Sequence, residues 1–252
     1  MAVLVTSPNP VNVGIDVGQV QDPMTVCVTE VYQRDTGKHR YTARPSLGGY
    51  NERGDWVPTS GIETVMVTEY AVRYISRLPL GTSYPDAAII IADLLCSSLL
   101  TGRKVRVLID STGVGKPVYE DLVKEFSLRK YGFYRQDGTF QEGKQIPETQ
   151  IKPINFVHGE KYNSKTGILG KSFLVSRLQS LLQSLRVHAP NTPEVLAMLE
   201  ELKIYERRMS QDGKDQYGAF KAGTHDDLAT SLGLSVLEDV FAEKVRYSGR
   251  VY

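Results

Sequence analysis

The chain has 252 residues, of which 41% are hydrophobic and 23% charged, a composition typical of a soluble globular protein rather than of a membrane-spanning or low-complexity chain. The formal net charge of +1 argues against recognition of a polyanion through overall charge, so any such partner would have to bind a local basic surface. The two cysteines, Cys27 and Cys96, favour a reducing compartment over a disulfide framework, and the N-terminus lacks the pattern of a secretion signal.

The first part of the chain has the patterns of three strands. The β-branched run Val11–Gly18 predicts a buried strand that ends in a turn, and Met24–Gln33 predicts a second strand that follows it as in a hairpin. Ile62–Ile75 predicts a third strand. Between them, the long polar stretch Arg34–Ser60 predicts a surface insertion in the form of a long loop.

The second part alternates helical and strand patterns. Helices are predicted at Tyr84–Leu100, Pro117–Gly132, Lys171–Val187 and Thr192–Tyr205. Strands are predicted at Lys104–Asp110 and Ile154–Gly159, and a hairpin is possible within Tyr205–Phe220. This order predicts an α/β fold with a mixed five-stranded sheet and helices on both faces.

The last helical pattern, in "GTHDDLATSLGLSVL" (Gly223–Leu237), begins with two adjacent acids. Apolar residues recur at every fourth position: Leu228, Leu232, Val236 and Val240. One interpretation is helix capping, with Thr224 as the N-cap and Asp227 completing a capping box. The other is that the start of the helix holds Asp226 and Asp227 in place as ligands. The motif alone leaves both interpretations open.

Two further acids lie in or at the end of apolar strands. Asp16 follows Ile15 in the first strand, and Asp110 closes the strand Lys104–Asp110. An ionised carboxylate among apolar residues is costly unless it is paired or bound to a metal. If these strands are neighbours, both acids converge with the start of the last helix. The alternative is that each acid caps a turn, and this alternative is strongest for Asp22, which precedes Pro23.

Clustered carboxylates without a basic partner suggest a cation site. Such groups repel one another unless divalent ions lie between them, and hard oxygen ligands select Mg²⁺ or Mn²⁺. Two ions about 4 Å apart activate a water molecule and stabilise the leaving oxygen of a phosphodiester. The acids therefore predict metal-dependent phosphodiester hydrolysis without a covalent intermediate.

Three stretches that contain these acids resemble a known family. In order and spacing, "VGIDVGQVQDPMTVCV", "VLIDSTGVGKPVYEDLVKE" and "GTHDDLATSLGLSVL" resemble the acidic motifs of the nuclease domain of viral large terminases, the DNA-packaging enzymes of tailed bacteriophages. The resemblance covers about Val11–Phe241 and implies an RNase H-like fold. It also implies a metal-dependent endonuclease that cuts concatemeric double-stranded DNA by a two-metal mechanism with Mg²⁺ or Mn²⁺.

The resemblance implies roles for six residues. The principal metal ligands would be Asp16, Asp110 and Asp227, with Asp226 and Asp22 as further ligand candidates. His225 would orient a neighbour or handle a proton, and the alternative is a loop histidine without a special role.

The resemblance also implies partners and a setting. In that family an ATPase motor domain precedes the nuclease, and this chain is too short to contain one. We therefore expect residues 11–245 to be the nuclease domain alone, residues 1–10 to be a leader or linker remnant and residues 246–252 to be a tail. The implied partners are the motor domain, a portal protein and a small terminase subunit, in the cytoplasm of an infected bacterium and without a membrane.

A local excess of basic residues suggests where DNA would lie. Residues 151–190 contain six lysines and arginines and a single acid, Glu160. A patch of this kind engages phosphates without reading bases, whereas the alternative is an ordinary solvated surface. The candidates for DNA contact, including two arginines before the last helix, are Lys161, Lys165, Lys171, Arg177, Arg207 and Arg208.

Three other functions remain open from the sequence. A junction resolvase or transposase also has an RNase H-like fold and uses acids, although no helix-turn-helix or zinc element is recognisable here. A P-loop-like nucleotide-binding protein would use "DSTGVGKP" or "KTGILGKS", each of which departs from GxxxxGK[ST]. A non-catalytic docking module would use its acids only as caps.

Overall fold

A computed structural model describes residues 9–18, 22–143, 146–157, 159, 161–211 and 226–238, without the side chains of residues 41–48, 58–63 and 204–211. The chain divides into two compact units, one formed by Met1–Val31 and Tyr70–Glu238 and the other by Tyr32–Glu69 and Asp239–Tyr252. In the described ranges, no helix combines the length and the apolar character needed to cross a membrane.

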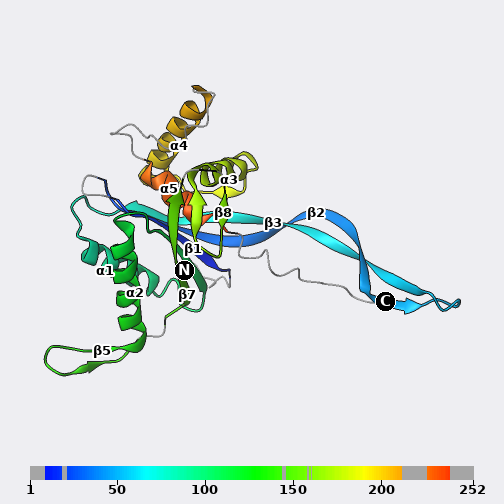
Figure 1. The fold of residues 1–252 in the computed structure, drawn as a ribbon, viewed down its shortest axis with the longest axis horizontal. Coiled ribbons are helices and arrows are strands. Elements are labelled where there is room, and N and C mark those ends of the chain that lie inside the picture. The colour runs from blue at the N-terminus through cyan, green and yellow to red at the C-terminus, as the bar shows by residue number, and fades with distance from the viewer. Residues whose placement is uncertain are drawn as a thin grey trace, which may run out of the picture. The chain divides into compact units, whose positions relative to one another are not determined.

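The central feature is a mixed β-sheet (Figure 1). In the described residues it has eight strands in the order β10-β3-β2-β1-β4-β7-β9-β8. Their bounds are β1 Val11–Asp16, β2 Thr25–Tyr50, β3 Trp56–Arg77, β4 Lys104–Asp110, β7 Glu148–Val157, β8 Tyr162–Asn163, β9 Ile168–Gly170 and β10 Val187–His188. β1 is antiparallel to β2 and parallel to β4, and β4 is parallel to β7. A separate two-stranded ribbon consists of β5 (Phe133–Tyr134) and β6 (Phe140–Gln141).

The predicted strands are all present, but the predicted number of five is wrong. The predicted strands correspond to β1, β2, β3, β4 and β7, which lie side by side in the sheet. The additional strands β8, β9 and β10 have only two or three residues each. Segments this short have no detectable periodicity, so only pairing with a neighbouring strand defines them.

The stretch predicted as a long loop, Arg34–Ser60, is largely strand. β2 continues to Tyr50 and β3 begins at Trp56, with a turn between them in which the amide of Gly54 donates to the carbonyl of Asn51 at 2.9 Å. The prediction is wrong because it equates a long polar stretch with a loop. A ribbon that is solvated on both faces satisfies its backbone groups by strand pairing and needs no apolar alternation.

Helices cover both faces of the sheet in the first unit, as predicted (Figure 1). The helices are α1 Tyr84–Leu95, α2 Gly115–Tyr131, α3 Lys171–Gln183, α4 Pro193–Gln211 and α5 Asp227–Ser235. The core with α1 and α2 includes Val13, Ile109 and Ile91. A second core, which includes Leu108, Leu174 and Leu234, lies on the face with α3 and α5.

Several predicted boundaries are corrected. α1 ends at Leu95, and α3 ends at Gln183 because Val187–His188 form β10. The predicted hairpin is wrong in its first half, since α4 continues to Gln211, and residues 212–220 lie outside the described part of the chain. Local spacing predicts that a helix exists more reliably than where it ends.

α5 packs directly on β1 because β1 has a glycine at the contact. A Cβ atom at Gly14 would overlap the carbonyl oxygen of Ser231 and lie 2.6 Å from the amide nitrogen of Ser235. The hydroxyl of Thr29 on β2 also donates to the carbonyl of Ser235 at 3.1 Å. The backbone of α5 therefore has a defined position on the strand that carries Asp16.

Candidate active site

Asp16 and Asp110 lie side by side at the ends of two parallel strands. On β1, Val13 and Ile15 point into the core formed with α1 and α2, so the two-residue alternation turns Asp16 to the opposite face, toward α5. Ile15 pairs with Ile109 in the parallel register of β1 and β4, which places Asp16 beside Asp110. The condition set by the sequence, that these strands are neighbours, is confirmed.

The turn after β4 holds Asp110. The amide of Thr112 donates to Asp110 Oδ1 at 2.8 Å, and the hydroxyl of Ser111 lies 3.0 Å from the carbonyl oxygen of Ile154 on β7. Burial raises the pKa of Asp110, while the hydrogen bonds from Thr112 and the charge of Lys171 oppose that effect. The net result is a carboxyl group whose pKa is higher than usual at the carboxyl end of a parallel strand, where α/β folds place their ligand sites.

The start of α5 brings in two more acids. Asp227 is the first helical residue and is buried, and Asp226 occupies the N-cap position. The predicted capping box is wrong, because the helix begins at Asp227 and Asp226 makes no capping hydrogen bond through its side chain. Thr224 and His225 lie outside the described residues. The Asp226 carbonyl accepts the amide of Thr230 at 2.8 Å as the first hydrogen bond of the helix.

The charges of the other three acids act on Asp16, which indicates that the four carboxylates lie near one another. Burial raises the pKa of Asp16 well above its usual value, and the negative charges of Asp110, Asp227 and Asp226 raise it further. The positive charge of Lys171 opposes this shift, and Lys171 Nζ lies 3.6 Å from Asp226 Oδ2. The acids thus come from β1, β4 and α5, which are distant in sequence, and the other three oppose the ionisation of Asp16.

The chemistry of this donor set fits a divalent cation. All four groups offer carboxylate oxygens, which hard cations such as Mg²⁺ and Mn²⁺ prefer, and a cation would relieve their repulsion. In the part of the chain that the structure describes, no three acidic, histidine or cysteine side chains form a ready-made metal site. Asp22, the remaining ligand candidate, is exposed in the bend before β2.

The basic candidates differ in their surroundings. Lys161 and Lys165 are exposed next to β8 and on the turn before β9. Lys171 is the first residue of α3 and lies beside Asp226. Arg207 and Arg208 belong to α4, and their side chains lie outside the description.

Arg177 has internal contacts that account for its position. Its Nε donates to the carbonyl of Val236 at 2.7 Å, and its Nη2 donates to the hydroxyl of Tyr70 at 3.0 Å. These bonds tie α3 to the end of α5 and to β3. Arg177 therefore supports the helix that carries the acids, a role that its place in a basic stretch did not indicate.

Sequence reasoning missed Glu201 on α4. Glu201 continues the buried helix face of Val195 and Met198 at three-residue spacing, and a glutamate in that series was the available signal. Burial raises the pKa of Glu201 to about 7, against the hydrogen bond from Ala229 and the charge of Arg77, and the nearby Asp227 and Asp226 raise it further. Glu201 thus lies within the electrostatic range of the acid site.

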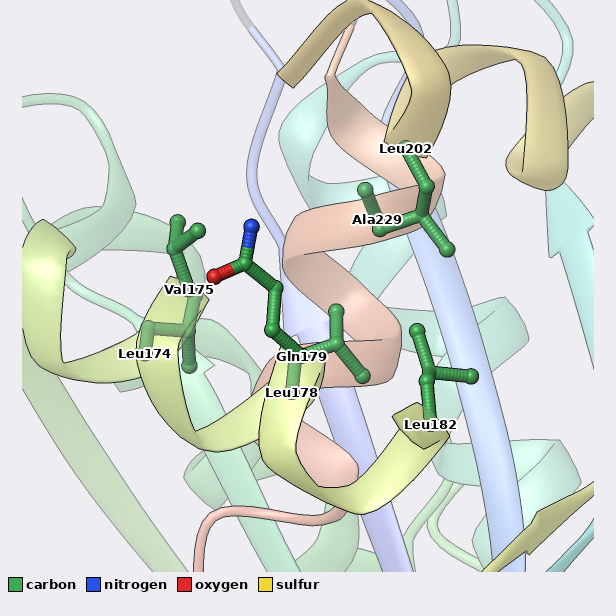
Figure 2. Close-up of a pocket in the computed structure, with 7 residues that line it drawn as sticks. All are labelled: Leu174, Val175, Leu178, Gln179, Leu182, Leu202 and Ala229. Atoms are coloured by element: carbon green, nitrogen blue, oxygen red, sulfur yellow. The ribbon is translucent and has the colours of Figure 1, made fainter. Parts of the chain in front are cut away.

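An apolar pocket lies between α3, α4 and α5 (Figure 2). It is lined by Leu174, Val175, Leu178, Gln179, Leu182, Leu202 and Ala229. None of these seven residues is charged, and none of the four acids lines the pocket. It does show how closely the start of α5 approaches α4, because Ala229 and Leu202 face the same space.

No protein-family model matches the chain, and no curated protein matches its sequence. Among solved structures, it is similar to the large terminase nuclease from thermophilic phage G20c, with 18% identity, a TM-score of 0.46, and 90% of this chain and 81% of that chain covered. It is also similar to the human cytomegalovirus terminase nuclease domain soaked with Mn, with 9% identity, a TM-score of 0.43, and 92% and 85% covered. A third structure is that cytomegalovirus domain with Mn and an inhibitor, with 9% identity, a TM-score of 0.41, and 90% and 81% covered.

Proposed function

We propose that this protein is a metal-dependent DNA endonuclease of viral genome packaging, which cuts concatemeric double-stranded DNA. The observation that carries the proposal is the convergence of Asp16, Asp110, Asp226 and Asp227 on one face of the sheet. Two carboxylates at the ends of parallel strands and two at the start of a helix, close enough to repel one another, are costly for a protein that does not use them. The likeness of their motifs to those of terminase nucleases indicates which reaction they serve.

The acids would hold Mg²⁺ or Mn²⁺, with two ions per site. Asp16, Asp110 and Asp227 would be the principal ligands, with Asp226 and Asp22 as additional ligands. When bound, the cations supply the Lewis acidity that activates water and neutralises charge on the phosphodiester. His225 would handle a proton beside Asp226. Hydrolysis then needs no nucleophilic side chain and no covalent intermediate.

Lys171 places a positive charge beside the four acids. Its ammonium group lies 3.6 Å from a carboxylate oxygen of Asp226 and lowers the pKa of Asp16 and Asp110. It therefore favours ionised carboxylates in the cation-free protein. Since Lys171 is also a DNA-contact candidate, it would place a positive charge where the scissile phosphate approaches.

DNA would approach over the segment β8–β9. Lys161 and Lys165 are exposed there and offer phosphate contacts that carry no sequence information. Nucleotide binding receives no support at "KTGILGKS", because Ile168–Gly170 form a strand paired with β7 where a phosphate-binding loop would be needed. We further propose that residues 11–245 act as the nuclease domain beside an ATPase motor, a portal protein and a small terminase subunit, in the cytoplasm of the bacterial host.

Plasmid cleavage tests the proposal directly. Supercoiled plasmid is incubated at low salt with Mg²⁺, Mn²⁺ or EDTA, and the wild type is compared with Asp16→Asn and Asp227→Asn. The matched control is Glu200→Gln, which changes an exposed acid on α4 whose side chain pairs only with Lys203 at 2.6 Å in the described ion pairs. We expect metal-dependent nicking that both aspartate variants lose and the control retains. Absence of cutting, together with absence of Mn²⁺ binding by calorimetry, would refute the proposal.

A further inference from the structure

The first turn of α5 receives a hydrogen bond partner from α4. Ala229 is the third residue of α5, and the first backbone amides of a helix have no partner within the helix itself. The amide of Ala229 donates to Glu201 Oε2 at 3.0 Å, and this bond is buried. The carboxylate of Glu201 therefore caps α5 from a different helix, 28 residues away in sequence.

The carboxylate of Glu201 is itself held at both oxygens. Oε1 accepts a hydrogen bond from Arg77 Nη2 on β3, while Oε2 accepts from Ala229. Glu201 is 6% exposed, so solvent screens these interactions little. In Figure 2, Leu202 and Ala229, the sequence neighbour and the hydrogen-bond partner of Glu201, both line the apolar pocket. The start of α5 is thus tied through one side chain to both α4 and β3.

Because Glu201 caps α5, the side chain of Asp226 is not needed as the cap of its own helix. Asp226 occupies the N-cap position, where aspartate commonly caps its own helix, yet its side chain makes no capping bond. It lies instead beside Lys171 and acts on Asp16. Glu201 performs the capping that Asp226 does not. The division allows the first turn to be ordered while both of its carboxylates remain in the acid site.

We propose that Glu201 is a positioning residue, which holds the first turn of α5 so that Asp226 and Asp227 meet Asp16 and Asp110. This inference rests on the proposed function for its catalytic consequence. Its structural consequence, the local order of α5, is independent of catalysis. Glu201 acts through the backbone of Ala229, so glutamine, whose amide oxygen can accept from Ala229 while its NH2 group cannot accept from Arg77, is expected to replace it in part.

Three variants of the full chain test this inference. Glu201→Met keeps the size of the side chain and removes the acceptor, Glu201→Gln keeps an acceptor without the charge, and Glu200→Met is the matched control on the exposed face of α4. Hydrogen exchange is followed by mass spectrometry in peptides from α5 and, as a reference for global unfolding, from β1. Plasmid cleavage is measured in parallel. The rate is followed as a function of Mn²⁺ concentration, and kcat and the KM for DNA are determined at saturating Mn²⁺.

We expect Glu201→Met to speed exchange at the start of α5 about tenfold, with β1 unchanged, because the amide of Ala229 loses its buried hydrogen-bond acceptor. The Mn²⁺ concentration for half-maximal cleavage is expected to rise about tenfold, as for other groups that orient metal ligands, while KM for DNA stays constant. Glu201→Gln is expected to restore part of the exchange protection and of the Mn²⁺ response, since it keeps one of the two acceptor oxygens. Glu200→Met is expected to match the wild type.

Several results would overturn the inference. It fails if Glu201→Met exchanges like Glu200→Met, if exchange rises equally in α5 and β1, or if Glu201→Gln is as impaired as Glu201→Met. A wild type that neither cuts DNA nor binds Mn²⁺ would refute the proposed function instead. In that case the exchange measurements still decide whether Glu201 orders α5, so the two failures are distinguishable.

Discussion

Thr25, the strand partner of Asp16, is hydrogen-bonded to the start of the helix that carries Asp227. Thr25 pairs with Asp16 across β2 and β1, and its hydroxyl donates a buried hydrogen bond of 2.7 Å to the backbone carbonyl of Asp227. Two acids that are 211 positions apart in the printed numbering are therefore connected through one threonine side chain. A substitution that removes only the hydroxyl group of Thr25 therefore tests whether this bond holds the two carboxylates in position.

Thr25→Val is expected to impair cleavage more than stability. Valine has the shape of threonine, so the change removes the hydrogen bond to Asp227 and costs about 1 kcal/mol of unfolding free energy. Thr29→Val is the matched control, because Thr29 bonds the other end of α5 at Ser235. We expect similar stability losses by urea denaturation, but a clear fall in kcat for plasmid cleavage only in Thr25→Val. Equal kcat values in the two variants would contradict this prediction.

Gly14→Ala is expected to separate α5 from β1. The new Cβ atom would overlap the carbonyl oxygen of Ser231, and rigid backbone has little freedom to move away. Overpacking of this kind costs about 3 kcal/mol of unfolding free energy. Gly49→Ala is the control, since a Cβ there meets nothing within 4 Å, and its cost should stay within about 0.5 kcal/mol. Thermal denaturation followed by circular dichroism measures both, and equal melting temperatures would refute the predicted contact.

The ionised carboxylate of Glu238 is expected to stabilise the fold, and this contribution is expected to be lost at acid pH. Burial opposes its ionisation, but hydrogen bonds from Lys152 and Tyr162 and the charges of Lys152 and Arg106 outweigh burial and lower the pKa of Glu238. A lowered pKa stabilises the fold above the ordinary value of about 4.3, and that contribution disappears as the pH falls through the lowered value. Glu238→Gln should cost about 2 kcal/mol at pH 7.

The corresponding measurement is urea denaturation of wild type and Glu238→Gln from pH 7 down to the acid limit of folding. The difference between the two should shrink as the pH falls below the ordinary glutamate value. A difference that stays constant with pH would show that the ion pairs with Lys152 and Arg106 do not stabilise the ionised form.

Asp16→Asn is expected to stabilise the protein in EDTA. Burial and the charges of Asp110, Asp227 and Asp226 raise the pKa of Asp16, so the folded chain binds more protons than the unfolded one above the ordinary aspartate pKa. Stability should therefore decline as the pH rises in the wild type, and decline less in the variant. Melting temperatures between pH 5 and pH 8 without metal test the sign. A lower melting temperature for Asp16→Asn across this range would contradict the predicted repulsion.

Lys161 and Lys165 are expected to contribute to DNA affinity through phosphate contacts. Replacing both with alanine should reduce the slope of log K against log salt by about 2, because each contact releases about 0.9 counterion. Lys116 and Lys124, which are exposed on α2, provide a control pair whose replacement should leave the slope unchanged. Fluorescence anisotropy with a duplex that has no specific site, in the presence of Ca²⁺, measures the slope. Equal slopes for both pairs would exclude this surface as the DNA contact.

The sequence by itself determined the main strands and the face of each acid. The runs "VNVGID" and "KVRVLID" alternate with a period of two, so burying Val13 and Ile15 or Val107 and Ile109 necessarily turns the terminal aspartate to the opposite side. Helical spacing likewise indicated the five helices, although not all of their ends. These features depend on neighbours within a few residues, which is the range over which periodicity carries information.

Only the tertiary structure decided which distant groups meet. The strand nature of Ile168–Gly170 depends on pairing with β7, and the role of Arg177 depends on the carbonyl of Val236, 59 residues away. The capping of α5 by Glu201 depends on the approach of two helices. The sequence does not indicate which partner each of these groups finds, although helical spacing places Glu201 on the buried face of α4. These contacts arise because buried backbone and charged groups must find a partner, and the packing of the fold determines which one lies within reach.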